Sequence, residues 1–215
     1  SPFTAVELLS RHAKFRDNTT QRWEKIPKGT APVLAVYPST GEGVLFYTQV
    51  YLTEMKGKQQ RGDDINILYE GDQIDRKSVI TALLLAKRYA NIEKNFIVHL
   101  RNTCPAEVVS GTSAGVSQFL AFYSYLTGFT LPSDVAYTGE IDLLGNVGAV
   151  GGIDVKVATA EACGFKHILL PEGNRTEVEM LDFPLSIKIH YVSTLDDVLS
   201  FLENYTEEVG DNCQT

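Results

Sequence analysis

The stretch Gly111-Thr112-Ser113-Ala114-Gly115 places a hydroxyl nucleophile between glycines, immediately before a run of residues with helical periodicity. A second stretch, Gly151-Gly152-Ile153-Asp154-Val155-Lys156, places a lysine in the first turn of another expected helix. A serine paired with a lysine is one way to build a hydrolase that needs neither histidine nor metal. The two stretches therefore predict a nucleophile and its base, and the fold must bring them together.

Ser113 is the candidate nucleophile. A serine before a helix is most often an N-cap, but here Thr112 can fill that role and leave Ser113 free. Gly111 and Gly115 allow a close approach of the backbone to a ligand. The exposed N–H groups from Gly111 to Ala114 are expected to form an oxyanion hole.

Lys156 is the candidate general base. A cation in the first turn of a helix is unfavourable by about 0.3–1 kcal/mol because of the helix macrodipole. That is a defect in a structural lysine, but it favours the neutral amine that a base requires. The apolar neighbours Ile153, Val155 and Val157 also disfavour the charge through desolvation. Lowering a lysine pKa from about 10.4 to about 7–8 requires roughly 3–5 kcal/mol of such effects.

Strands and helices interleave along the chain. Alternation and short apolar runs predict strands at 33–37, 44–53, 65–69, 96–100, 135–138, 141–144, 167–170 and 187–192. After a turn at 56–58, the strand at 65–69 is expected to pair with the strand at 44–53. This interleaving indicates an α/β or α+β domain.

Helical spacing of apolar residues predicts four helices, at 75–90, 116–126, 154–163 and 195–202. Asp75 and Asp154 are the expected N-caps of the first and third helices. Gly128 and Gly164 are the expected stops of the second and third. A capping box that begins at Thr194 opens the last helix.

Composition excludes several classes of protein. The 215 residues are 44% hydrophobic and 21% charged, which suits one globular domain with a sizeable core. No apolar run approaches the roughly 18 residues of a membrane-spanning helix. A net charge of −8 is the wrong sign for phosphate backbones, so no nucleic acid partner is expected. We divide the chain into a leader or end of a preceding segment at 1–29, a domain at 30–205 and a polar tail at 206–215.

Cysteine and histidine usage argues against metal and triad chemistry. The three cysteines are scattered and form no CxxC pair, which argues against zinc and favours a reducing compartment. The cytoplasm or mitochondrial matrix is therefore favoured over secretion. The glycine-rich turn at 145–152 lacks the Gly-Lys-Ser/Thr ending of a phosphate loop. We expect the four histidines, His12, His99, His167 and His190, not to cluster. The last three lie on expected strands, where a core histidine is favoured over a triad base.

The sequence resembles the proteolytic domain of Lon proteases over roughly residues 30–203. The resemblance is carried by TGEI at 138–141, GNVGAVGGI at 145–153, Lys156, and GFKHILLPEGN at 164–174. It implies an α+β proteolytic domain with mixed β-sheets and flanking helices, and a catalytic dyad of Ser113 and Lys156. It also implies that Thr138 lies beside the lysine and helps to orient it. Unfolded or flexible polypeptides are the implied substrates, and a homo-oligomer, a hexameric ring, is the implied assembly.

Three departures from the family pattern concern gating and energy supply rather than the dyad. VVSGT stands at 108–112, where the family often has Pro-Lys-Asp-Gly-Pro. Asp154 stands where the family usually has the first of two lysines. The ATPase module that precedes the family domain is absent from these residues, so we expect no cofactor in this chain itself. ATP is expected only where an AAA+ module precedes it in the natural protein.

The sequence therefore predicts a serine endopeptidase that works through an acyl-enzyme. Two alternatives stay open. One is a viral polyprotein protease that uses the same dyad to process its own termini. The other is a Lon-like assembly or binding module without activity.

Overall fold

The computed structural model describes residues 22–57, 62–67, 75–103, 111–181 and 185–205. Most of the expected leader and all of the expected tail at 206–215 lie outside these residues, as do two of the cysteines. Within the described residues, no helix is long and apolar enough to cross a membrane.

A four-stranded sheet forms one layer of the molecule, with strand order β1-β2-β4-β3. The strands are β1 (Thr30–Val36), β2 (Gly43–Glu54), β3 (Asp64–Ile67) and β4 (Phe96–Asn102). β2 pairs antiparallel with both β1 and β4, whereas β3 runs parallel to β4. The expected pairing of 65–69 with 44–53 is therefore wrong. Both edges of β2 are occupied, by β1 and β4, and β3 instead pairs with the outer edge of β4, to which α2 connects it in a β-helix-β crossover.

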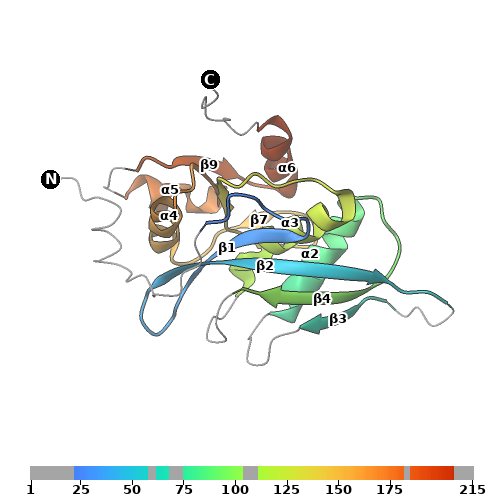
Figure 1. Ribbon diagram of the computed structural model, residues 1–215. Coiled ribbons are helices and arrows are strands. Elements are labelled where there is room, and N and C mark those ends of the chain that lie inside the picture. The colour runs from blue at the N-terminus through green and yellow to red at the C-terminus, as the bar shows by residue number, and fades with distance from the viewer. Residues whose placement is uncertain (1–21, 58–61, 68–74, 104–110, 182–184, 206–215) are drawn as a thin grey trace, which may run out of the picture.

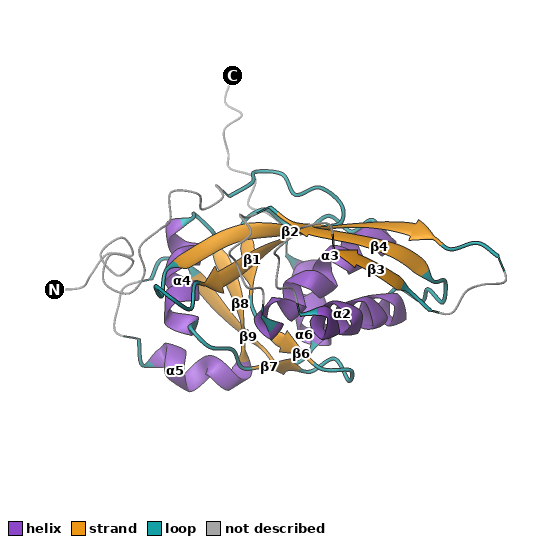
Figure 2. Ribbon diagram, turned by 90° about the horizontal axis from the view of Figure 1, so that it is seen from below, coloured by secondary structure: helices purple, strands orange, loops and turns teal. Residues whose placement is uncertain are grey.

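Two helices cover one face of this sheet (Figure 2), namely α2 (Arg76–Tyr89) and α3 (Gly115–Thr127). The Asp75 side chain accepts hydrogen bonds from the backbone N–H groups of Lys77 and Ser78, which confirms it as the N-cap of α2. Gly128 ends α3 in the left-handed conformation with φ 75°, as expected. Phe119, Leu120 and Phe122 of α3 are fully buried in the larger core between these helices and the sheet.

A second sheet is parallel and three-stranded, in the order β5-β8-β9. Its strands are β5 (Val135–Tyr137), β8 (His167–Pro171) and β9 (Lys188–Val192). The helices that accompany it in Figure 1 are α4 (Ile153–Ala162), α5 (Arg175–Glu179) and α6 (Leu195–Asn204). The predicted capping box of α6 is present, between Thr194 and Asp197. A smaller core contains Leu34 and Leu45 of the first sheet and Ile168 of β8. Ile153 of α4 belongs to the same core, so α4 packs against both sheets.

A short antiparallel hairpin of β6 (Glu140–Ile141) and β7 (Val147–Gly148) connects β5 to α4. The strand expected at 141–144 is wrong beyond Ile141. The Asp142 side chain accepts hydrogen bonds from the backbone N–H groups of Leu144 and Asn146, both at 2.9 Å, and so bends the chain into a turn. The arrangement as a whole is α+β, with antiparallel and parallel pairing in the sheets and helices on their flanks, as the sequence predicts.

The expectation that the histidines do not cluster is also wrong. His167 of β8 and His190 of β9 lie in contact, with Nδ1 and Nε2 2.9 Å apart. Parallel pairing sets Leu169 opposite His190, and His167 lies two residues from Leu169 on the same face of the sheet. Phe201 of α6 packs against both imidazole rings. Neither histidine is among the residues that line the cavity described next.

Candidate active site

Ser113 and Lys156 line the same cavity, which has a volume of about 420 Å³. Its walls come from the end of β1, the turn before α3, the β6–β7 hairpin and the loop before α4. The other lining residues are mostly small or apolar: Ala35, Val36, Pro38, Gly111, Thr112, Glu140, Ala149, Val150, Gly151 and Gly152. The fold thus brings together two residues that lie far apart in the sequence.

Ser113 lies in a 3-10 turn, η1 (Thr112–Ala114), that leads directly into α3. Gly139 donates its N–H to the Ser113 carbonyl at 3.2 Å and accepts from the Val116 N–H at 3.1 Å, which fastens the turn to the segment after β5. No side chain caps either the turn or α3, so the expected capping role of Thr112 is wrong. The Ser113 hydroxyl nevertheless makes no hydrogen bond with any other described residue and is available to a ligand.

The backbone of η1 removes one donor from the expected oxyanion hole. Ala114 already donates its N–H to the Gly111 carbonyl at 3.3 Å. Its side chain is 3% exposed and packs in a cluster with β1 and β2 residues rather than lining the cavity. Ala114 is therefore not a supporting site residue through its own N–H. The N–H groups of Thr112 and Ser113 open the turn and have no intrahelical acceptor.

Lys156 is the fourth residue of α4, and its side chain is 4% exposed. Burial lowers the pKa of its amine to about 8. The amine forms no ion pair or hydrogen bond within the described part of the chain. A buried lysine without a counter-charge is unusual, because burial of an uncompensated charge is strongly unfavourable.

The N-terminus of α4 differs from the expectation. Gly152, in the left-handed conformation with φ 63°, is the N-cap, and no side chain bonds to the helix start. Asp154 lies inside the first turn, two residues after the N-cap, so its expected role is wrong. A Cβ on Gly152 would lie 2.9 Å from Cγ2 of Val36, so both the conformation and the space require glycine. This close contact holds the start of α4 against β1.

Thr138 follows β5 directly and is 2% exposed. Its backbone N–H donates to the Leu169 carbonyl at 3.3 Å, which fixes it to β8. Its hydroxyl is buried and has no hydrogen-bond partner among the described residues, Lys156 included. The expected hydrogen bond between the Thr138 hydroxyl and the Lys156 amine is therefore not formed in this structure.

Two residues of interest were not singled out from the sequence. Among the described lining residues Glu140 is the only carboxylate, and its place in the TGEI motif could have drawn attention to it. Asn174 does not line the cavity, yet its amide is hydrogen-bonded to Val150, which does. The sequence feature that could have pointed to Asn174 is the PEGN turn at 171–174, which is part of the family resemblance.

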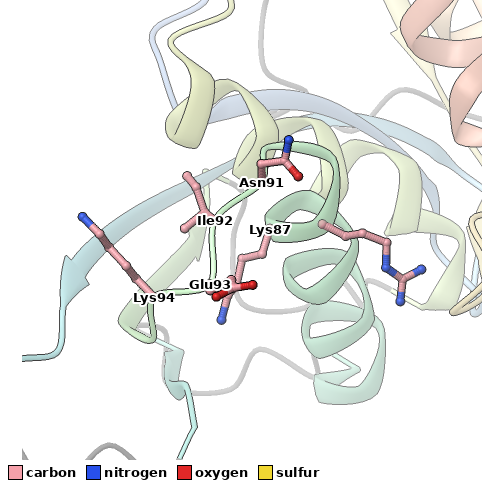
Figure 3. Close-up of a pocket in the computed structure, with 6 residues that line it drawn as sticks. Lys87, Asn91, Ile92, Glu93 and Lys94 are labelled. Atoms are coloured by element: carbon pink, nitrogen blue, oxygen red, sulfur yellow. The ribbon is translucent and has the colours of Figure 1, made fainter.

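A larger hollow of about 530 Å³ lies where α2 runs into β4 (Figure 3). Lys87, Asn91 and Lys94 are among its lining residues. Its buried cation is already satisfied, because Lys87 Nζ lies 3.1 Å from the Asp63 carboxylate and 3.3 Å from Asn95 Oδ1. Among the residues described, no group of three His, Cys, Asp or Glu side chains could hold a metal ion. The Ser113–Lys156 cavity is therefore the better candidate site.

Comparison with known proteins agrees with the resemblance read from the sequence. The family model described as the Lon protease (S16) C-terminal proteolytic domain matches residues 4–203. The Lon protease of Lawsonia intracellularis is 35% identical over 205 residues, which cover 90% of this chain and 23% of that protein. Lon protease 2 of Sorangium cellulosum is 32% identical over 210 residues, covering 93% of this chain and 24% of that protein. The chain therefore spans about a quarter of the length of these relatives.

Proposed function

This chain belongs to the Lon protease (S16) family, whose C-terminal proteolytic domain it matches, and we propose that it is an endopeptidase with Ser113 as nucleophile and Lys156 as general base. One observation carries the proposal: a buried lysine lines the same cavity as a serine hydroxyl, and neither group is ion-paired or hydrogen-bonded to another described residue. Each feature alone has structural explanations. Together they match the needs of acyl transfer without histidine or metal.

The lowered pKa matters because only the neutral amine can accept a proton. A lysine of pKa about 10.4 is almost wholly charged at pH 7, whereas one of pKa about 8 is neutral in roughly a tenth of molecules. Lys156, with its pKa lowered to about 8 by burial, falls in the second class. It is thus a competent base near neutral pH, and its conjugate acid can still return the proton.

The proposed reaction has two stages. Neutral Lys156 accepts the hydroxyl proton while Ser113 Oγ attacks the peptide carbonyl carbon, which gives a tetrahedral oxyanion. The C–N bond then breaks, the protonated lysine gives its proton to the leaving amine, and an acyl-enzyme remains. In the second stage the neutral lysine accepts a proton from water, whose oxygen attacks the ester. Collapse of this second intermediate returns the proton to Ser113 and releases the acid.

The N–H groups of Thr112 and Ser113 are the proposed oxyanion donors. Both belong to the 3-10 turn that Gly139 fastens in place, so they are oriented before substrate arrives. Donors fixed in advance stabilise developing charge without a reorganisation cost. Ala35, Val36 and Val150 make the adjacent walls apolar, which favours a substrate with an apolar side chain near the cut. We expect short or unfolded polypeptides as substrates, because a native domain resists opening by about 5–15 kcal/mol.

The test is hydrolysis of a fluorogenic, unfolded peptide with apolar residues, by the chain and by four variants. Ser113→Ala and Lys156→Arg should each reduce kcat by about 10²-fold or more, because a guanidinium cannot act as a base. Thr176→Ala, at an exposed position of α5 outside the cavity, is the hydroxyl control, and Lys87→Arg is the matched buried-cation control. Both should stay within a few-fold of the parent chain.

A serine-directed acylating reagent separates this proposal from a Lon-like module without activity. Stoichiometric labelling that Ser113→Ala abolishes is expected, and EDTA should not affect it. Labelling that survives in Ser113→Ala would remove Ser113 as the nucleophile. An unlabelled, inactive but folded chain would favour the assembly module.

A further inference from the structure

Asn174 lies at the end of a second 3-10 turn, η2 (Glu172–Asn174), between β8 and α5. Its side chain is polar and only 2% exposed, so its amide must be satisfied within the protein. Figures 1 and 2 both show α5 beside α4, the helix that carries Lys156. The question is what a buried amide does at this junction.

The amide makes a reciprocal pair of hydrogen bonds with a single backbone residue. Asn174 Oδ1 accepts the Val150 N–H at 3.0 Å, and Nδ2 donates to the Val150 carbonyl at 2.9 Å. This side chain therefore does what a neighbouring strand would do in an antiparallel ladder. It fixes the backbone on both sides of Val150 in a segment that belongs to no strand.

A third contact settles which end of the amide is the nitrogen. Nδ2 also donates to Glu177 Oε2 at 3.3 Å, and an ionised carboxylate can only accept. The turn around the amide is packed closely as well. A Cβ placed on Gly173 would lie 3.1 Å from Cβ of Ala149, so η2 lies flat against the loop.

The loop at 149–152, which the Asn174 amide holds, lines the cavity and leads directly into α4, the helix that carries Lys156. Ala149, Val150, Gly151 and Gly152 all line the cavity. The Gly152 carbonyl accepts the Lys156 N–H at 3.0 Å, which closes the first turn of α4. Only Gly151 therefore separates the clamped Val150 from the helix cap, Gly152.

We propose that Asn174 is a positioning residue for the active site, and that its clamp on Val150 sets the place of the 149–152 loop and, through Gly152, of Lys156. This inference rests on the proposed function of Lys156 as the base. Asn174 touches neither the nucleophile nor the cavity, so it acts only through the loop. Without the clamp, the loop has lost both backbone bonds at its centre, and water can reach the buried amine.

The experiment compares Asn174→Ala and Asn174→Asp with Val178→Ala. The aspartate keeps the acceptor for the Val150 N–H but sets a carboxylate oxygen against the Val150 carbonyl and Glu177. Val178 is a buried α5 residue, 5% exposed, and is the control for general loosening of that region. Three quantities are measured for each: hydrogen exchange of the Val150 amide, kcat/KM on the unfolded peptide, and the pH midpoint of activity.

Both Asn174 variants should lose protection of the Val150 amide, and kcat/KM should fall by about 10- to 100-fold, the range expected for a small displacement of catalytic groups. Their pH midpoint should rise above that of the parent chain, because a hydrated lysine is more basic. Val178→Ala, compared at an equal loss of Tm, should keep both the midpoint and the protection. Asn174 variants that behave as Val178→Ala does would overturn the positioning role.

The two proposals fail in different ways. If Lys156→Arg were active, the base assignment would fail while exchange at Val150 still reported the clamp. If Lys156→Arg were inactive but Asn174→Ala kept its midpoint and kcat/KM, the base would stand and the positioning role would not.

Discussion

Two lysines are buried in the described part of the chain, and their surroundings are opposite. Lys87 is 8% exposed on α2, and its amine lies 3.1 Å from the Asp63 carboxylate at the outer edge of the four-stranded sheet. Lys156 is 4% exposed on α4, and none of the described residues gives its amine a carboxylate or other polar partner. The same residue type is therefore compensated in one region and uncompensated in the other.

The difference separates a structural cation from a group available for chemistry. The Asp63 carboxylate also accepts the Phe96 N–H at 2.7 Å, so the Lys87 pair ties the segment before β3 to both α2 and β4. At Lys156, a pKa lowered from 10.5 to about 8 means that the charged form costs about 3 kcal/mol in the folded protein. A cost of this size in a domain of marginal stability needs a functional reason.

The largest expected effect is the loss of activity on removal of the Lys156 amine. Lys156→Met should lower kcat by about 10²- to 10⁴-fold, the usual contribution of a general base. Lys87→Met should leave kcat within about twofold at a temperature where the variant is folded, because Lys87 is absent from the cavity. Peptide hydrolysis at saturating substrate measures both. Equal losses in the two variants would erase the functional distinction between the lysines.

The free energy of unfolding should change in opposite directions in the two methionine variants. Lys87→Met leaves the largely buried Asp63 carboxylate without its partner and should lower the free energy of unfolding by about 3 kcal/mol. Lys156→Met removes an unfavourable charge and should raise it by up to about 3 kcal/mol at pH 7. Urea unfolding at pH 7 measures both changes, with Lys87→Met/Asp63→Leu as the control that removes the orphaned charge.

The pH dependence of the Lys156→Met effect follows from the direction of the shift. The folded pKa is about 8 and the unfolded pKa is near 10.5, so between these values the unfolded chain binds more protons. The parent chain therefore loses stability as the pH falls through this window, and the methionine variant does not. Its advantage should be full at pH 7 and small near pH 10.5. A methionine variant less stable than the parent chain at pH 7 would contradict the cost assigned to the charge.

A smaller loss of kcat is expected on substitution of Thr138. This substitution tests whether a neutral hydroxyl orients the Lys156 amine, as the Asp63 carboxylate holds the Lys87 amine. If its unpaired hydroxyl orients the amine during the reaction, Thr138→Val should lower kcat by about tenfold. Thr48→Val is the matched control, because Thr48 is 1% exposed and its hydroxyl is also buried without a partner. Unchanged kcat in both variants would leave Thr138 a packing residue only.

Prediction from the sequence succeeded where the signal was local. Asp75, Gly128 and the Thr194–Asp197 box act within a few residues of themselves, and each is confirmed as a cap. The lysine at the start of a helix in apolar company was also visible, since neighbours in sequence supply much of its burial. That it has no partner was not visible, because any residue of the fold could have supplied one.

The failures share a long-range cause. The partner of β3 depends on which edges of β2 are filled, and the contact of the two histidines depends on the register of β8 and β9. Asp154 is a residue type that often caps helices, but α4 begins two residues earlier than expected, after Gly152, which packs closely against Val36 of β1. The role of Asn174 needs a loop that lies 24 residues away in the sequence.

The smallest expected effect concerns the contact between His167 and His190. Burial, followed by the proximity of His167 and Lys188, lowers the pKa of His190. The unfolded chain then binds the proton more readily, so stability should fall as the pH drops through the ordinary histidine range near 6.5. His190→Gln should flatten this dependence in urea unfolding between pH 5 and 7.5. An equally steep dependence in the variant would assign it to other groups.

The most direct test of Lys156 as an uncompensated base is its own titration. NMR of the protein with ¹³Cε-labelled lysine, with the resonance assigned by its loss in Lys156→Arg, gives the midpoint without reference to activity. The structure predicts a midpoint of about 8, matched by the midpoint of the pH–activity profile. A midpoint near 10.5 in the folded protein would mean that the amine is hydrated or paired, and it would contradict the assignment of Lys156 as the base.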